Sequence, residues 1–200
     1  MPRPIDPEKY ESRRAAIVTA ASTEFATHGY QASTTAGICR EAGISSGTFF
    51  HYFPTKLDAL VAVLESGCDD LRDHLARIEQ NASGLEAVLR YATALGAEVS
   101  EESYRVFVAG LAGVESDPRV AAALQAEATL IDDFLARHVE AGQQTCEIRR
   151  DAPASDLARW VSWLLDGASQ AAAVAPAPMQ TPATVESLLR GGIHALLDPR

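Results

Sequence analysis

Residues 43–53 read GISSGTFFHYF and have a spacing that suggests chemistry. The first five letters match G-x-S-x-G, in which a serine on a sharp strand-to-helix turn is the nucleophile of a hydrolase. Such an enzyme needs a strand before Ser45 and a β-sheet that supplies an acid and a histidine. The preceding residues instead place Ile38 and Ala42 four apart, on one face of a helix. The context therefore disfavours a serine hydrolase, and we expect the chain not to be an enzyme.

Metal and redox chemistry have little support in the sequence. Cys39, Cys68 and Cys146 are odd in number and far apart, so neither a disulfide framework nor a C-x-x-C motif is available. No H-E-x-x-H motif or paired histidine and carboxylate motif occurs. We expect reduced thiols, no metal and no cofactor. A redox sensor at Cys68 or Cys146 is the alternative.

The composition is that of a globular protein without a membrane segment. The 200 residues are 47% hydrophobic, enough for a large core. The longest apolar run, residues 170–179, is rich in alanine and proline and too short to cross a bilayer. The charged N-terminus lacks the apolar stretch of a signal peptide. We expect a cytoplasmic protein.

Charge is distributed unevenly along the chain. The net charge of -10 argues against a nucleic-acid partner, because phosphate binding normally needs a basic surface. Residues 1–56, however, carry six basic and five acidic side chains, whereas residues 57–200 carry eleven and twenty-two. The two parts are therefore expected to have different partners.

Helix signals recur along the whole chain, and the alternation typical of strands is missing. Thr55 to Asp58 and Ser83 to Glu86 have the spacing of capping boxes, and glycine or proline marks the ends. These signals predict an all-α fold of about nine helices, over residues 8–28, 35–42, 46–52, 55–80, 84–98, 101–114, 118–141, 155–174 and 182–197. A boundary near Pro54 separates residues 1–54 from residues 55–200.

Two of the short helices have the form of a helix-turn-helix around Gly43, which supplies the positive φ of the turn. In the second helix Phe49 and Phe53 share one face and should pack on helix 8–28. The opposite face keeps small and polar side chains at the helix start, which can approach base edges in the major groove.

At these residues the sequence resembles the N-terminal domain of the tetracycline-repressor (TetR) family. The matched positions are Ile17, Ala20, Ala21, Phe25, Gly29, Tyr30, Thr34, Thr35, Ile38, Ala42 to Ser45, Gly47, Thr48, Tyr52, Phe53, Lys56 and Leu60. The resemblance implies a three-helix DNA-binding domain at residues 1–54 and a helical ligand-binding and dimerisation domain at residues 55–200. It also implies a homodimer that binds a palindromic operator in double-stranded DNA. When a small-molecule effector binds to the C-terminal domain, the protein leaves that operator. The chain is therefore expected to be a repressor.

The resemblance assigns DNA contacts residue by residue. Phosphate contacts fall to Thr34, Thr35, Tyr52 and Lys56, and base contacts to Ser46, Gly47 and Thr48, with Ser45, Phe50 and His51 as further DNA-binding positions beside them. Phe50 stands where relatives often have tyrosine, so apolar contact with a thymine methyl or a sugar replaces a hydrogen bond to phosphate. For Thr34 and Ser45, a role as helix cap is an equal alternative.

The last two predicted helices each carry an apolar stripe. In TetR-like proteins such a pair forms the dimer interface, here Trp160, Val161, Leu164, Leu165, Ala168, Leu188, Leu189, Ile193 and Leu196. The alternative is that both stripes complete the core of the single chain.

Bulky side chains in the same region are candidates to line an effector cavity: Tyr91, Tyr104, Phe107, Phe134, His138 and Trp163. Asp166 would select a cationic effector and Arg105 an anionic one, and the sequence does not choose between them. The alternative function is an all-α ligand-binding or protein-interaction module that does not use its helix-turn-helix for DNA.

Overall fold

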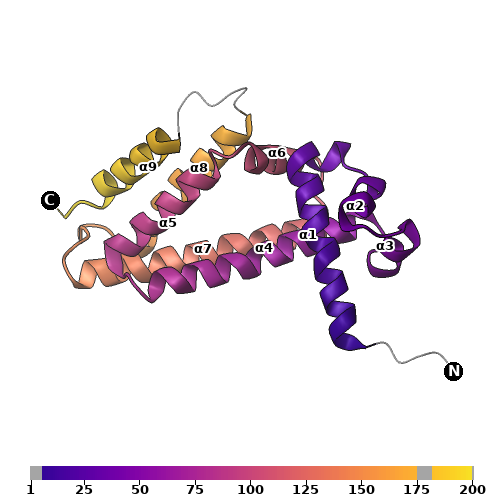
Figure 1. The fold of residues 1–200 in the computed structure, drawn as a ribbon. Coiled ribbons are helices and arrows are strands. Elements are labelled where there is room, and N and C mark those ends of the chain that lie inside the picture. The colour runs from indigo at the N-terminus through magenta and orange to yellow at the C-terminus, as the bar shows by residue number, and fades with distance from the viewer. Residues whose placement is uncertain (1–5, 175–181, 200) are drawn as a thin grey trace. The chain divides into compact units, whose positions relative to one another are not determined.

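The computed structural model describes residues 6–174 and 182–199, which form nine α-helices and no strand (Figure 1). The all-α prediction is confirmed over these residues. The helices are α1 (Pro7–Ala32), α2 (Thr35–Ala42), α3 (Ser46–Tyr52), α4 (Lys56–Glu79), α5 (Gly84–Glu98), α6 (Glu102–Gly110), α7 (Pro118–Gln144), α8 (Ala154–Val174) and α9 (Pro182–Leu197). The predicted helix stop at residues 176–178 lies outside the described residues. None of the described helices combines the length and apolar character needed to cross a bilayer.

The chain divides into two compact units. The first contains residues 1–67 and 106–123, and the second contains residues 68–105 and 124–200. This division by compactness differs from the boundary near Pro54, because the start of α4 and residues 106–123 pack with α1–α3. The boundary near Pro54 concerns function and remains a prediction.

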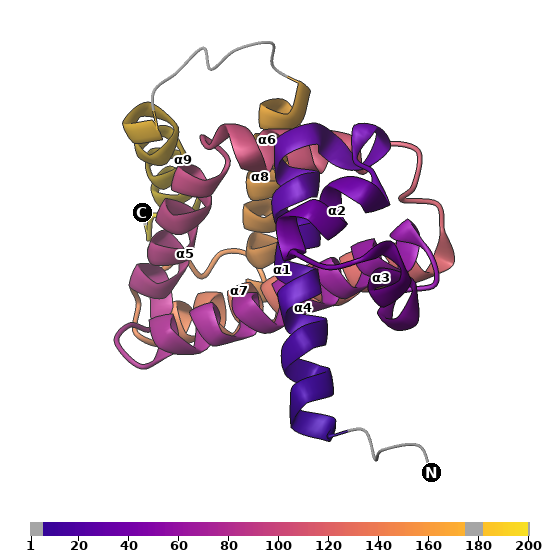
Figure 2. The same cartoon turned by 45° about the vertical axis from the view of Figure 1, so that its right-hand side comes forward.

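In the first unit, α1, α2 and α3 lie together (Figure 2), and their buried side chains form an apolar core. Its fully buried side chains include Ile17, Phe25, Ile38, Phe49 and Leu60. Gly29, with φ 72° and ψ 157°, interrupts α1 at the predicted stop. Gly43 ends α2 with φ 63°, the left-handed conformation that the helix-turn-helix interpretation requires.

The start of α4 is fixed by a capping box. The Asp58 carboxylate accepts hydrogen bonds from the Thr55 backbone N–H at 2.8 Å and hydroxyl at 2.7 Å, and the Thr55 hydroxyl accepts from the Asp58 N–H. Arg119 also binds Asp58, at 2.6 Å. The Thr55 hydrogen bonds, followed by the Arg119 contact, lower the pKa of the Asp58 carboxyl.

The second unit is built on α5 and α7 with α8 and α9 packed on them. Its core includes Val88, Phe134, Leu135 and Val161, all fully buried. Helix α9 packs along α5, and a Cβ atom at Gly96 of α5 would lie 3.0 Å from the Glu186 backbone.

Several helix-end predictions are wrong, among them the end of α7, which runs to Gln144 rather than to residue 141. Ser83 makes no side-chain hydrogen bond as the cap of α5, and Glu86 instead binds Arg90 at 2.8 Å. Helix α6 ends at Gly110 rather than at residue 114. Gly110 lies against α1, where a Cβ atom would be 2.6 Å from the Tyr30 backbone nitrogen. The following residues form turns, with Gly113 at φ 87°.

Candidate DNA-binding and ligand-binding sites

Helix α3 is held in place by its two phenylalanines and by its N-terminal cap. Phe49 is fully buried and Phe53 is 3% exposed. The Ser45 hydroxyl accepts a hydrogen bond from the Thr48 backbone N–H at 3.2 Å and lies 3.0 Å from the Thr48 hydroxyl. Ser45 is therefore a helix cap, whatever else it contacts. In the described chain Ser45 caps a helix and no strand precedes it. It therefore does not occupy the strand-to-helix turn that the hydrolase interpretation requires.

The outward face of α3 carries the predicted base contacts. Ser46, Gly47 and His51 are exposed, and the Phe50 ring is 50% exposed, although it is a large apolar side chain. Thr48 is half-buried and engaged with Ser45. The structure thus brings these side chains to one accessible helix face, with small residues at the N-terminal end.

Tyr52 lies beside a residue that the sequence did not single out. Its ring centroid is 4.6 Å from that of Tyr10, near the start of α1, and the His51 ring is 6.2 Å from Tyr10. Tyr52 is half-buried by this contact. No local signal marks Tyr10, because its partners are about forty residues away.

The N-terminal end of α2 contacts the buried carboxylate of Glu24. The Thr34 hydroxyl accepts from the Gly37 N–H at 2.9 Å, so its role as a cap is confirmed, and Thr35 follows as the first helical residue, half-buried. Glu24, only 8% exposed, accepts from the Thr34 N–H at 3.4 Å. Its carboxylate fills the space that a side chain at Gly37 would need.

Lys56 has a structural role besides the predicted phosphate contact. Its ammonium donates to the carbonyl oxygens of Tyr30 at 2.6 Å and Ser33 at 2.8 Å, and lies 4.3 Å from the centre of the Tyr30 ring. Burial lowers the pKa of this ammonium. Lys56 thus ties the start of α4 to the segment between α1 and α2.

The apolar stripes of α8 and α9 are divided between core and surface. Val161, Leu165, Leu189 and Ile193 are buried, while Ala168 and Leu196 are half-buried. The outer set, Trp160, Trp163, Leu164 and Leu188, is 57%, 54%, 38% and 58% exposed. We call these four residues the α8/α9 patch. The buried members of each stripe complete the core of the single chain, while the assignment of the stripes to a dimer interface remains a prediction.

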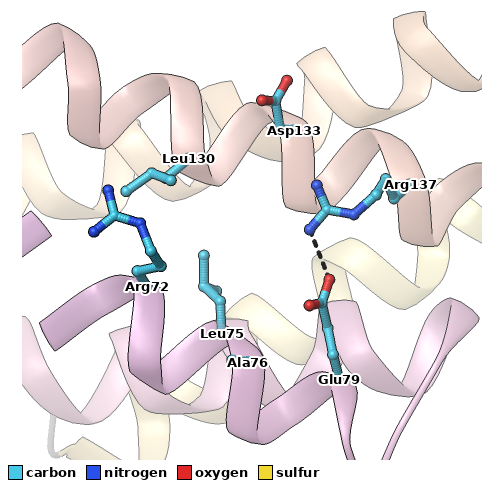
Figure 3. Close-up of a pocket in the computed structure, with 7 residues that line it drawn as sticks. All are labelled: Arg72, Leu75, Ala76, Glu79, Leu130, Asp133 and Arg137. Carbon is cyan, nitrogen blue, oxygen red and sulfur yellow. Dashed lines mark hydrogen bonds and ion pairs between the residues drawn. The ribbon is translucent and has the colours of Figure 1, made fainter. Parts of the chain in front are cut away.

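One pocket of the second unit lies between α4 and α7 (Figure 3). It has a volume of about 160 Å³ and is lined by Arg72, Leu75, Ala76, Glu79, Leu130, Asp133 and Arg137. Arg137 and Glu79 face each other across one end, 2.6 Å apart. Ligand pockets typically have volumes of about 300–1,000 Å³. This small pocket, closed by an ion pair, is better explained as packing between two helices.

The predicted ligand-binding side chains do not line that pocket. Tyr91 and Phe134 are buried with ring centroids 5.8 Å apart, and His138, 7% exposed, lies 4.4 Å from Phe134. Tyr104 is half-buried. Phe107, also half-buried, falls in the first unit. Trp163 does not face inward in the single chain; it packs edge-on against Trp160 at 5.1 Å.

The histidine among these residues is held by a neighbouring carboxylate. His138 Nε2 is 3.3 Å from Glu79, and its Nδ1 is buried without a partner in the described structure. Burial lowers the pKa of His138, and the hydrogen bond with Glu79 opposes this effect. The pKa of Glu79 is lowered, chiefly by its hydrogen bond with Arg137.

Two family profiles match the chain. One, described as "Bacterial regulatory proteins, tetR family", matches residues 17–63, and the other, "BetI-type transcriptional repressor, C-terminal", matches residues 82–198. The chain belongs to the TetR family of transcriptional regulators.

Curated relatives carry names of the same class. The HTH-type transcriptional regulator UidR of Escherichia coli K12 is 28% identical over 141 residues, which span 69% of this chain and 70% of UidR. HbdR of Aromatoleum sp. is 36% identical over 72 residues, so the match covers 36% of this chain and only 31% of HbdR.

Solved structures share the TetR-family fold. A regulator from Saccharomonospora viridis in complex with choline has a TM-score of 0.81 at 19% identity, over 95% of this chain and all of that one. FadR from Bacillus subtilis in complex with stearoyl-CoA has a TM-score of 0.66 at 20% identity, over 90% of this chain and 99% of FadR. At this identity the likeness establishes the fold. The two ligands also differ in charge, so the fold does not fix the effector.

Several charged residues of this TetR-family chain have structural or electrostatic effects that their sequence context did not predict. Glu24 and Lys56 hold backbone groups of the helix-turn-helix, and in the second unit the charges of Glu98, Glu127 and Asp166 add to burial, the main cause, in raising the pKa of Tyr91. For Glu98 the sequence did contain a signal, because a spacing of seven residues places it on the same helix face as Tyr91. The contacts of Glu24 and Lys56 had none, because their partners are 10 to 26 residues away.

Proposed function

We propose that this protein is a dimeric, ligand-responsive repressor whose α3 helices read a palindromic operator. The observation that carries the proposal is the outward face of α3. Small or exposed side chains occupy it, while Phe49 and Phe53 anchor the opposite face in the core. A helix of this kind enters the major groove, and two copies read half-sites roughly 34–36 Å apart.

The roles proposed for the DNA-contacting residues follow the family resemblance and the accessibility of these side chains. Ser46, Gly47 and Phe50 approach base edges, and Thr48 contributes through its hydroxyl and through its bond with Ser45. Thr35, His51 and Tyr52 contact phosphate, together with the backbone N–H groups at the start of α2. Lys56 uses its remaining N–H for phosphate while it holds Tyr30 and Ser33.

Dimerisation is proposed to bury the α8/α9 patch against a second copy. Two exposed tryptophans and two exposed leucines on adjacent helices form an apolar surface. Such a surface is unfavourable in water and is typical of a protein interface. Helices α8 and α9 of both copies then form a four-helix bundle, and the twofold symmetry matches that of a palindrome. The DNA-binding function of residues 1–54 depends on this pairing.

Release from DNA is proposed to be a shift between two conformations of the dimer. An effector that binds one conformation better draws the population toward it, and linkage requires DNA to weaken effector binding by the same factor. The helix α4, which spans the boundary between the two compact units, is proposed to transmit the change. The structural neighbours with choline and stearoyl-CoA support a small-molecule effector of either charge. The protein acts in the cytoplasm and is not an enzyme.

The test is selection of bound sequences from random duplex DNA, followed by fluorescence anisotropy with the selected operator. We expect a palindromic consensus bound by a dimer, with steep salt dependence because phosphate contacts release counterions. Recovery of unenriched DNA would overturn the proposal and favour a module that does not use its helix-turn-helix.

A further inference from the structure

The first turns of α1 are exposed except on one narrow face. Between Pro7 and Ala16 only Tyr10 and Arg14 are half-buried, and the other side chains are exposed. The first fully buried side chain of the helix is Ile17. Figure 2 shows this end of α1 extending beyond α2 and α3. What Tyr10 and Arg14 contact therefore shows what this end of the helix packs against.

The narrow face lies against the C-terminal end of α3. The Tyr10 ring centroid is 4.6 Å from that of Tyr52, and the ring planes are inclined by 33°. Four residues later, the Arg14 guanidinium lies 5.3 Å from the centre of the Phe53 ring. Residues four apart share one face of a helix, so this face of α1 contacts two consecutive residues. Helix α3 is thus held at its N-terminal end by the Ser45 cap and at its C-terminal end by α1.

This end of α1 does not have the charge of a separate DNA-binding surface. Residues 6–16 carry three basic and three acidic side chains. Lys9 lies 3.5 Å from Asp6, so part of the basic charge is already paired. Binding to phosphate normally needs an excess of basic side chains. The contact with α3, rather than the charge, is the feature of this segment that needs an explanation.

A ring contact of this kind determines where the Tyr52 hydroxyl lies. The phenol oxygen is rigidly attached to its ring, and only two torsions join the ring to the backbone. The backbone of α3 is itself anchored by the buried rings of Phe49 and Phe53. Contact with Tyr10 therefore leaves the Tyr52 hydroxyl little freedom. A side chain that is ordered in the free protein does not have to be ordered on binding, which improves affinity.

We propose that Tyr10 is a positioning residue for operator binding and that it acts through Tyr52. The Tyr10 ring holds the Tyr52 ring in the free protein, so that the Tyr52 hydroxyl is in place for a DNA phosphate before the operator arrives. Tyr10 itself makes no hydrogen bond to DNA. The inference deepens the proposed function and rests on it, because the phosphate contact of Tyr52 is part of that proposal.

The first test is fluorescence anisotropy of the full-length protein with the selected operator. Tyr10→Ala should weaken binding about fivefold per half-site, the cost of ordering one interfacial side chain, and so about 25-fold for a dimer on two half-sites. Tyr10→Phe should bind as the wild type does, because the ring contact does not need the hydroxyl. Ser12→Ala changes an exposed residue of the same helix and should also leave binding unchanged. The inference is overturned if Tyr10→Ala keeps the wild-type affinity, or if Tyr10→Phe loses as much as Tyr10→Ala.

A double-mutant cycle shows whether Tyr10 acts through Tyr52. Tyr52→Phe keeps the ring, removes the hydroxyl and should itself weaken binding. In that background Tyr10→Ala should have no further effect, because no hydroxyl remains to be positioned. Additive losses would show that Tyr10→Ala acts by some other route. A Tyr52→Phe protein with wild-type affinity would show that the hydroxyl has no partner on the DNA, and either result overturns the inference.

Modified DNA separates positioning from a general loss of structure. Single phosphates of the operator are replaced by methylphosphonate, and the phosphate that Tyr52 contacts is the one whose replacement weakens the wild type more than Tyr52→Phe. At that phosphate Tyr10→Ala should also lose less affinity than the wild type, whereas elsewhere the losses should match. Equal losses of Tyr10→Ala and the wild type at every phosphate overturn the inference. If thermal melts show that Tyr10→Ala is unfolded at the assay temperature, Tyr10→Leu takes its place, because leucine favours a helix and has no ring.

The outcomes distinguish this inference from the proposed function. A wild-type protein that selects no operator overturns both. A wild-type protein that binds its operator, with variants that fail the comparisons above, overturns the role of Tyr10 alone.

Discussion

The Glu24 carboxylate occupies the space directly above Gly37, so that any side chain at position 37 would overlap it. Glu24 is also bound by the Thr34 backbone N–H and lies 3.5 Å from His28. The packing of α1 on α2 thus depends on a missing side chain at one position and a buried charge at the other.

Gly37→Ala is expected to destabilise the first unit by about 1–3 kcal/mol, the usual cost of overpacking a tight contact. Urea unfolding followed by circular dichroism measures the change. Gly67→Ala is the control, because position 67 is exposed within α4 and has open space around it. That variant should gain about 0.5–1 kcal/mol from helix propensity. A loss of stability in both variants would show that alanine is harmful for a reason other than the Glu24 contact.

Lys56→Met should lower the free energy of unfolding by about 1–3 kcal/mol, because two hydrogen bonds from a charged donor are lost. Methionine keeps an apolar stem of similar length. The same variant should weaken binding to all DNA sequences alike, whereas Thr48→Ala should change the sequence preference. Unfolding curves and anisotropy on a panel of operator variants measure both effects. Unchanged stability of Lys56→Met would mean that the contacts with Tyr30 and Ser33 contribute little.

Phe50 should recognise the methyl group of a thymine. Replacing that thymine by uracil removes one methyl group and should weaken operator binding about fourfold, given about 0.8 kcal/mol per buried carbon. With Phe50→Ala the replacement should have no further effect, because the partner of the methyl group is already gone. Uracil substitution at each thymine of the operator, measured by anisotropy with both proteins, tests the pair. The assignment is wrong if no substitution affects the wild-type protein more than the variant.

Leu188→Asp should convert the dimer into a monomer, because it places a charge in the α8/α9 patch. The single chain should remain folded, since Leu188 is 58% exposed within it. Light scattering after size-exclusion chromatography measures the mass, and a thermal melt confirms folding. Thr129→Asp adds the same charge at an exposed position of α7 and should leave the mass unchanged. A dimeric Leu188→Asp protein would place the interface elsewhere.

The stability gained by Glu127→Gln should depend on pH. Because the folded-state pKa of Glu127 is raised, its stabilising contribution is present below the ordinary value of 4.5 and is lost as the pH rises through the raised pKa. The variant should therefore melt at a higher temperature than the wild type at pH 7.5, and at the same temperature near pH 4. Glu140→Gln, which removes an exposed carboxylate from the same helix α7, is the control. A difference that does not change with pH would exclude the titration of Glu127 as its cause.

Local signals predicted most of the helix bounds, and a distant contact accounts for the early end of α6. Helices α2, α3, α5 and α9 have the predicted bounds, because glycine, proline and capping residues mark their ends within the sequence. Helix α6 stops four residues early, because Gly110 meets Tyr30, which lies 80 residues before it in the chain.

The same distinction holds for the sites. The caps from Thr34 to Gly37 and from Ser45 to Thr48 join residues three apart, and the sequence suggested both. Glu98, Glu127 and Asp166 come from three different helices, and no periodic pattern connects Glu127 with Asp166. The exposure of the α8 side chains could not be predicted from the sequence either. Periodicity assigned Trp160 and Val161 to one stripe, but only Val161 is buried.

The close contacts at Gly110, with backbone, and at Gly37, with the Glu24 side chain, have a consequence for how such a protein can evolve. Positions that hold the first unit together leave no volume for new side chains, whereas the outward face of α3 is free of such constraints. Mutation can therefore retarget the protein to a different stretch of genome while its scaffold stays fixed. A gene duplicate could acquire a new set of controlled promoters by a handful of changes on that one surface.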